Sequence, residues 1–266
     1  MTDKTMQQEA IAFLRRNSLR NIVPLKMLTA YPAVIETHYH AAGDEAAALL
    51  LFPTTAFAYD RATYADLDLV VILAATTPAA ADALLPQIPT DKKLIFKLMD
   101  EAVRQVLAAS LPLQRVTAFL SYTATDRQRF GARPAVTVAD QVDERLDPLF
   151  AGQGHEATEL HRYFAGGQAR TYTLYQAHEP VAACFSYQNF DMIHEIGGVF
   201  TLPAQRRKGY AQQVVETAVH SLLNRGCLPR YQVHEINQPS IALAEQIGLT
   251  RFVTVEHWRY LPDHAG

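Results

Sequence analysis

The sequence predicts an α+β fold in which a mixed central sheet is flanked by helices. Short apolar runs with strand character alternate with segments of helical periodicity along the whole chain. Of the 266 residues, 49% are hydrophobic and 19% are charged, which is typical of a protein with a sizeable packed core. This length suggests two domains or one large one. The polar segment Asp126–Ala135 is the expected join, between a smaller α/β domain over residues 1–130 and a second domain over 135–266.

The first half begins with a helix over Met6–Asn17, because its apolar residues fall on one helical face. Thr77 is expected to cap a short helix that starts at Pro78, since proline is favoured at the first helical position. The other elements follow from apolar strand-like runs and one further helical pattern: strands over Val34–His40, Ala46–Phe52, Leu67–Ala74, Lys93–Leu98 and Arg115–Tyr122, and a helix over Asp100–Ser110.

The second half is dominated by one long helix over Lys208–Asn224, whose apolar residues recur at helical spacing. Gly226 lies where a glycine commonly ends a helix. The remaining elements are read in chain order: a strand over Val136–Ala139, helices around Asp143–Phe150 and His155–Phe164, strands over Arg170–Tyr175, Pro180–Tyr187 and Met192–Thr201, a strand over Arg230–Ile236, a helix over Pro239–Gln246 and a final strand pair within Arg251–Leu261.

Charge and cysteine content narrow the function classes. A net charge of −3 gives no reason to expect nucleic acid or a membrane surface as a partner. Cys184 and Cys227 form no metal-binding or disulfide pattern, so we expect a cytoplasmic protein. His38 and His40 share one strand face, but no third ligand stands out and no metal is expected.

The segment Glu195–Ala211, which reads E-I-G-G-V-F-T-L-P-A-Q-R-R-K-G-Y-A, carries the chemistry. A β-branched strand runs through a short loop into an amphipathic helix, and the loop holds Arg206-x-x-Gly209-x-Ala211. The first amides of a helix have no internal acceptor, and the helix dipole favours an anion there. Small residues at this place would let a pyrophosphate approach those amides, and Arg207 and Lys208 add positive charge.

This pattern resembles the acetyl-CoA signature of the GNAT (GCN5-related N-acetyltransferase) superfamily. A second match follows, in which Val233, Asn237, Ser240 and Ile247-Gly248-Leu249 resemble the next strand, helix and turn of that family. The T-x-P-x-x-R-R-K-G-Y-A run is closest to the FR47-like, glycine-N-acyltransferase-like branch. The resemblance covers residues 136–261 and implies a GNAT fold there.

The resemblance also implies acetyl-CoA as cosubstrate and an amine of a small molecule or peptide as acceptor. The cofactor-binding residues that it implies are Val199, Phe200, Thr201, Arg206, Arg207, Lys208, Gly209, Tyr210, Ala211, Asn237 and Ser240. Gly197 and Gly198 lie where the family often has a β-bulge that separates two strands. Glu195 precedes this bulge and is the candidate general base, acting through a water, while His194 would point to the opposite face.

Several alternatives stay open. Glu195 could instead pair with a nearby cation, and Asn237 could cap the helix near Pro239. Many family members have a tyrosine as general acid where this chain has Ala244, so a non-catalytic acyl-CoA-binding protein is the alternative function. A tRNA-dependent aminoacyl-transferring enzyme is disfavoured, because such proteins do not need an intact CoA motif.

The first half is either an unrelated α/β domain or a degenerate copy of the second. Its segment Ala74–Ala80 occupies the place of the CoA loop and carries no cation. A degenerate copy would therefore not bind CoA, and would shape the acceptor pocket or form the surface of a homodimer.

Overall fold

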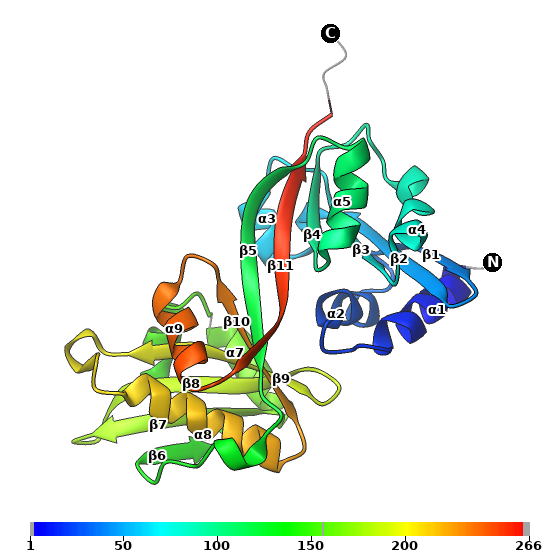
Figure 1. The fold of residues 1–266 in the computed structure, drawn as a ribbon. Helices are drawn as coiled ribbons and strands as arrows, with labels where there is room; N and C mark the ends of the chain where they lie inside the picture. The colour runs from blue at the N-terminus through cyan, green and yellow to red at the C-terminus, as the bar shows by residue number, and fades with distance from the viewer. Residues whose placement is uncertain (1–2, 156, 263–266) are drawn as a thin grey trace. The chain divides into compact units, whose positions relative to one another are not determined.

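The computed structural model describes residues 3–155 and 157–262. The chain divides into two compact units, one made of Met1–Phe119 with Val253–Gly266 and the other of Leu120–Phe252. Each unit combines helices with a mixed sheet, so the predicted α+β class is confirmed (Figure 1).

In the first unit, strands β1 to β4 lie in sequence order and β11 follows β4. The pairs β1–β2, β2–β3 and β4–β11 are antiparallel, whereas β3–β4 is parallel. The elements are α1 (Asp3–Arg15), α2 (Ile22–Ala30), β1 (Glu36–Ala42), β2 (Glu45–Pro53), η1 (Thr54–Ala56), α3 (Ala58–Thr63), β3 (Leu69–Ala75), α4 (Pro78–Asp82), η2 (Leu85–Gln87), β4 (Leu94–Leu98), α5 (Glu101–Ser110) and the later part of β11 (Thr250–Tyr260).

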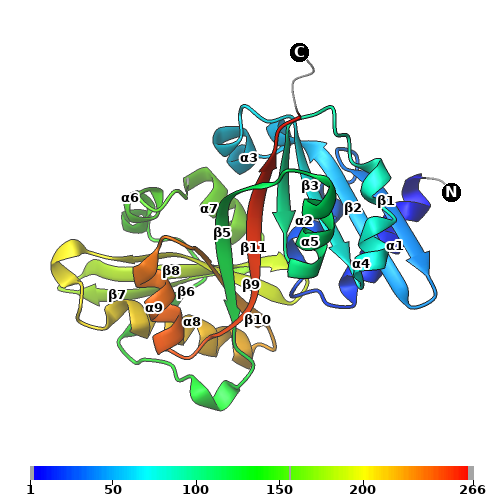
Figure 2. The same ribbon diagram turned by 45° about the horizontal axis from the view of Figure 1, so that its top comes forward.

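In the second unit the strand order is β10-β9-β8-β7-β6, with β9–β10 parallel and the other pairs antiparallel. The elements are the later part of β5 (Gln114–Thr123), η3 (Arg127–Arg129), β6 (Val136–Ala139), η4 (Glu144–Leu146), α6 (Asp147–Ala151), α7 (Ala157–Ala165), β7 (Ala169–Gln176), β8 (Glu179–Phe190), β9 (Ile193–Thr201), η5 (Pro203–Gln205), α8 (Tyr210–Asn224), β10 (Leu228–His234) and α9 (Gln238–Gln246). Helices α6 and α7 lie on one side of β7–β9, and α8 and α9 lie on the other (Figure 2).

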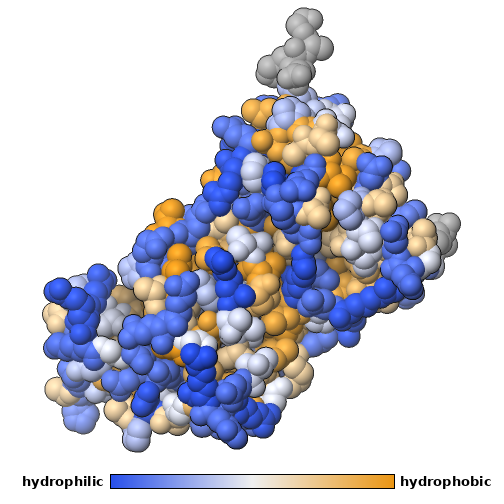
Figure 3. Space-filling view, in the orientation of Figure 1, coloured by the Kyte–Doolittle hydropathy of each residue, from blue (hydrophilic) through white to orange (hydrophobic). Residues whose placement is uncertain are grey.

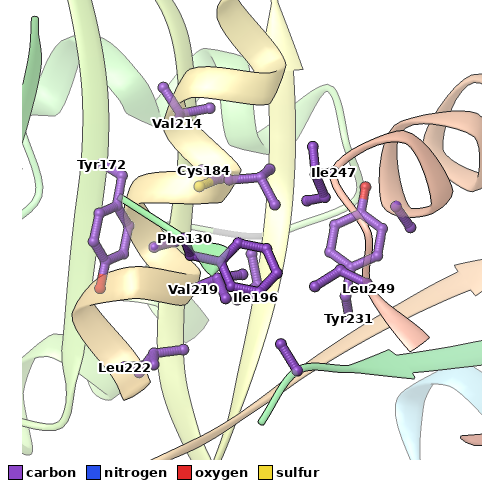
Figure 4. Packing of buried hydrophobic residues seen from close by; sticks show 14 of the residues in the cluster. Phe130, Tyr172, Cys184, Ile196, Val214, Val219, Leu222, Tyr231, Ile247 and Leu249 are labelled. Atoms are coloured by element: carbon purple, nitrogen blue, oxygen red, sulfur yellow. The ribbon is translucent and has the colours of Figure 1, made fainter. Parts of the chain in front are cut away.

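The core of the second unit fixes helix α8 against the sheet. The apolar face predicted for this helix is buried, and Val214, Val219 and Leu222 pack with Cys184 of β8 and Ile196 of β9 (Figure 4). This packing sets the position of the first turn of α8 relative to the end of β9.

Two expectations about the chain differ from the structure. Residues 251–260 lie in one strand, β11, rather than in a strand pair, because no turn-forming residue interrupts the run before Pro262. The polar segment Asp126–Ala135 lies inside the second unit and not between the units. Phe130 explains this, since its side chain is buried in the core with α8, and its carbonyl lies 2.8 Å from Nδ1 of His220.

Each unit shows the same succession of antiparallel strands, a helix, a parallel strand and another helix. This agrees with the hypothesis that the first half is a degenerate copy, which stays a prediction.

Candidate functional site

The loop before α8 has the backbone expected of an anion site. Arg207 and Gly209 both have left-handed backbone, with φ of +62° and +77°. Gln213 N–H donates to Gly209 O at 3.1 Å, so the three preceding amides of the first turn have no acceptor inside the helix. Gly209 offers no side-chain cap, and a Cβ there would meet nothing within 4 Å. The amides therefore lie without a side-chain cap at the positive end of the helix.

Helix α4 of the first unit, by contrast, has a side-chain cap at its start. Thr77 caps α4, and its Oγ1 accepts from Ala80 N–H at 3.2 Å. Because this side chain occupies the position of an incoming anion, α4 lacks the open amides of α8.

Three cationic side chains surround the α8 loop, and all are exposed. Arg206 Nε donates to Thr201 O at 3.3 Å, which fixes the loop to the end of β9. Lys208 Nζ donates to Gln205 Oε1 at 2.6 Å, and Arg207 extends from a left-handed residue. Figure 3 shows hydrophilic residues at the surface over α8, interspersed with hydrophobic ones.

Tyr210 and Ala211, in the first turn of α8, are both half-buried. The Tyr210 hydroxyl accepts from Gln176 Nε2 at 2.5 Å. This bond ties the start of α8 to the end of β7.

Strands β9 and β10 separate next to this loop. Within the described residues their pairing runs from Ile193–Leu228 to Glu195–Arg230 and goes no further, although β9 continues to Thr201. The later half of β9, including Val199, Phe200 and Thr201, therefore has backbone groups on its β10 side that are not engaged in that pairing.

A β-bulge accompanies the separation, as the paired glycines predicted. The register of β8 against β9 shifts between Ala183 and Phe185, and Gly198 has a φ of +61°. A Cβ on Gly198 would lie 2.5 Å from Phe185 Cε1, so only glycine fits this position.

Asn237 performs the alternative role that the sequence left open. Its side-chain oxygen accepts from Ser240 N–H at 3.2 Å and caps α9. A role of Asn237 and Ser240 in binding a ligand stays a prediction. Ala244, at the position where the family that the sequence resembles often has a tyrosine, is fully buried in the core and offers no acid.

The candidate base Glu195 is buried and forms an ion pair. Its Oε2 lies 2.5 Å from Arg230 Nη1 and accepts from Asn189 Nδ2 at 2.9 Å. Arg230 also donates to Ser121 Oγ at 3.2 Å, so the carboxylate belongs to a polar network that ties β9 to β10 and β5. His194 is buried next to the end of α8, where burial and then the charge of Arg225 lower its pKa to about 4.

Sequence reasoning missed a group of aromatic side chains over the bulge. The ring of His155 packs edge-on against Phe185, with centroids 4.9 Å apart, and Tyr163 stacks on Tyr187 at 4.1 Å. A Cβ on Gly197 would lie 3.6 Å from His155 Nε2. No sequence signal identifies this contact, because His155 lies in the loop between α6 and α7, far from β9 in the chain.

The described residues contain no group of three or more His, Cys, Asp and Glu side chains that could hold a metal ion. Nor is any of their helices long and apolar enough to cross a membrane.

Comparison with known proteins identifies the architecture. Residues 159–257, less than half of the chain, match the family model described as GNAT acetyltransferase. No curated protein is a significant match to the sequence.

Solved structures match the chain over almost its whole length. A Drosophila protein shares 12% identity over 98% of this chain and 97% of its own, with a TM-score of 0.58. A GCN5-related N-acetyltransferase from Kribbella flavida shares 15% identity over 96% and 97%, with a TM-score of 0.55. A tandem GNAT protein from the clavulanic acid biosynthesis pathway shares 12% identity over 97% of both chains, with a TM-score of 0.54.

At these identities the structural matches show the fold alone. Together with the matched segment, they support a GNAT-type fold for this chain.

Proposed function

We propose that this protein transfers an acetyl group from acetyl-CoA to an amine of a small molecule or peptide. The observation that carries the proposal is the open, left-handed loop at Arg207–Gly209, placed at the first turn of α8 beside the point where β9 and β10 separate. The loop supplies backbone amides that can bind a pyrophosphate. The separation of β9 from β10 supplies a strand edge along which the pantetheine arm can extend.

The residues present fit a CoA thioester. The amides of Arg207–Ala211 would hold the pyrophosphate, with the exposed side chains of Arg206, Arg207 and Lys208 adding charge-assisted contacts. The backbone of Val199–Thr201 would pair with the pantetheine arm as an added strand does. Both contacts use the backbone, and they place the acyl group near the Gly198 bulge.

Amide formation needs orientation of the amine, an acceptor for its proton and stabilisation of the oxyanion. Glu195 is the base predicted from the sequence, but its carboxylate already binds Arg230 and Asn189. To act as a base, it would have to exchange one of these contacts for the amine or a bridging water. Glu195→Gln therefore slows turnover about 100-fold if this carboxylate takes the proton, and leaves the rate nearly unchanged if its role is the ion pair.

We also propose a family branch, a cellular compartment and a role for the first unit. The T-x-P-x-x-R-R-K-G-Y-A run supports the FR47-like branch. Cys184 and Cys227 are free and buried, which fits a reducing compartment such as the cytoplasm. In the first unit, Thr77 caps the start of α4, so this unit would not bind CoA. It would instead shape the acceptor pocket or form the surface of a homodimer.

Release of free thiol from acetyl-CoA, measured over a panel of small amines and short peptides, tests the function. Transfer requires thiol release that depends on the amine and yields the acetylated acceptor. Acetyl-CoA binding without thiol release would instead identify a non-catalytic acyl-CoA-binding protein. Failure to bind acetyl-CoA at millimolar concentration would overturn both functions.

A further inference from the structure

The loop between α6 and α7 brings an imidazole to the bulge of β9. His155 is half-buried, and its backbone N–H donates to Phe150 O at 3.1 Å, which fixes the loop against the end of α6. Its ring packs edge-on against Phe185, with an interplanar angle of 85°. The backbone hydrogen bond thus positions the loop on α6, and the ring contact positions the imidazole against β8.

The ring faces a strand position that has no side chain. A Cβ on Gly197 would lie 3.6 Å from Nε2 and 3.7 Å from Cε1 of His155. Gly197 directly precedes the bulge residue Gly198, where the proposed acyl group would lie. A larger residue at Gly197 would stand between the imidazole and this part of β9, so the glycine leaves the approach clear.

The titratable groups on the surrounding elements include the hydroxyls of Tyr187 on β8 and Tyr163 on α7, the imidazoles of His194 on β9 and His161 on α7, and the carboxylates of Glu195 on β9 and Asp147 on α6. Tyr187 and Tyr163 stack on each other with an interplanar angle of 15°. The Glu195 carboxylate is bound by Arg230 and Asn189, as described above. The Asp147 carboxylate lies 3.4 Å from Nε2 of His161.

We propose that His155 is the group that accepts the proton of the attacking amine, an inference that rests on the proposed acetyl transfer. The amine nitrogen forms a bond to the thioester carbonyl carbon and loses its proton to the imidazole. The carbon–sulfur bond breaks with its electron pair on sulfur, which leaves the amide, the CoA thiolate and the imidazolium. The imidazolium then gives its proton to the thiolate or to solvent, so no tyrosine is needed where the chain has Ala244.

Two variants of His155 separate its chemistry from its packing. His155→Phe keeps a ring against Phe185 and removes the base, whereas His155→Gln keeps polarity and removes the ring. His161→Gln is the matched control, because His161 is an exposed histidine on the neighbouring helix α7. Acetyl-CoA affinity is measured first for each protein by calorimetry, and we expect it to be unchanged in all three.

The decisive readout is the rate of thiol release from acetyl-CoA between pH 5 and pH 8. The acceptor is the amine that reacts fastest in the panel, or water if no amine reacts. Protonation of the amine acceptor slows the wild type and the variants equally, so its effect drops out of the ratio of the wild-type rate to the variant rate. Because only neutral imidazole accepts a proton, this ratio rises with pH and reaches about 100 or more for both His155 variants. For His161→Gln it stays near one.

A ratio near one, or a ratio that is constant over the pH range, would overturn the role of His155. Wild-type protein that binds acetyl-CoA but releases no thiol to any amine or to water would also overturn it. Failure of the wild type to bind acetyl-CoA is a different result, which rejects the proposed function at its first step.

Discussion

Replacing Gly209 tests whether the amides at the start of α8 hold the pyrophosphate. Gly209 has a φ of +77° and open space where a Cβ would be, so Gly209→Gln causes backbone strain without a steric clash inside the protein. A left-handed backbone at a non-glycine residue costs about 1–2 kcal/mol, which leaves the fold intact. The new side chain would, however, occupy the space in front of the helix amides.

The chain provides a matched control at the other end of the same helix. Gly226 has a φ of +75° and likewise nothing within 4 Å of a Cβ, so Gly226→Gln introduces the same strain away from the loop. Both variants should lose about the same free energy of unfolding in urea.

Only Gly209→Gln should lose affinity for acetyl-CoA. A hydrogen bond to a charged group contributes about 1.5–3 kcal/mol, and each 1.4 kcal/mol is tenfold in affinity. Loss of one amide–phosphate bond therefore weakens binding roughly 10- to 100-fold in calorimetric titration. Equal affinity of the two variants would refute the assignment of the pyrophosphate to this loop.

Three further predictions concern stability, each measured by urea unfolding. Buried His194 has a pKa of about 4, so on acidification the unfolded chain takes up this proton before the folded protein does. The free energy of unfolding therefore falls by roughly 3 kcal/mol between about pH 6.5 and pH 4. His194→Leu should flatten this dependence of the free energy of unfolding on pH. Hydrogen bonds from Arg145 lower the pKa of Asp143 to about 2, so their contribution to stability is present above about pH 4 and is lost toward pH 2. If Asp143→Asn loses as much free energy of unfolding between pH 4 and pH 2 as the wild type does, this prediction is contradicted. Arg230→Met leaves the Glu195 carboxylate buried without its cation and should cost roughly 3–5 kcal/mol, whereas adding Glu195→Gln should recover part of that loss.

Features set by local backbone chemistry could be predicted from the sequence. The apolar periodicity of α8, the glycine at its first turn and the paired glycines of β9 specify the helix, the open amides and the bulge. Each of these depends on residues that are close in the chain. The cap of α4 by Thr77 was predictable for the same reason.

Features set by contacts between distant segments could not be predicted. The partner of Glu195 is Arg230, on the adjacent parallel strand. This ion pair gives the carboxylate a structural role beside the catalytic one that was predicted from the sequence. His155 reaches Gly197 only because α6 packs against β9. Helix α2 was missed because Pro24 lies in an apolar stretch that shows no clear helical face.

The most direct test of the central claim follows the backbone amides during titration with acetyl-CoA by two-dimensional NMR. The account predicts that the largest shifts fall on the amides of residues 199–201 and 207–212, in the later half of β9 and the first turn of α8. Shifts concentrated elsewhere, for example on the start of α4, or no shifts at millimolar acetyl-CoA, would contradict the assignment of this site.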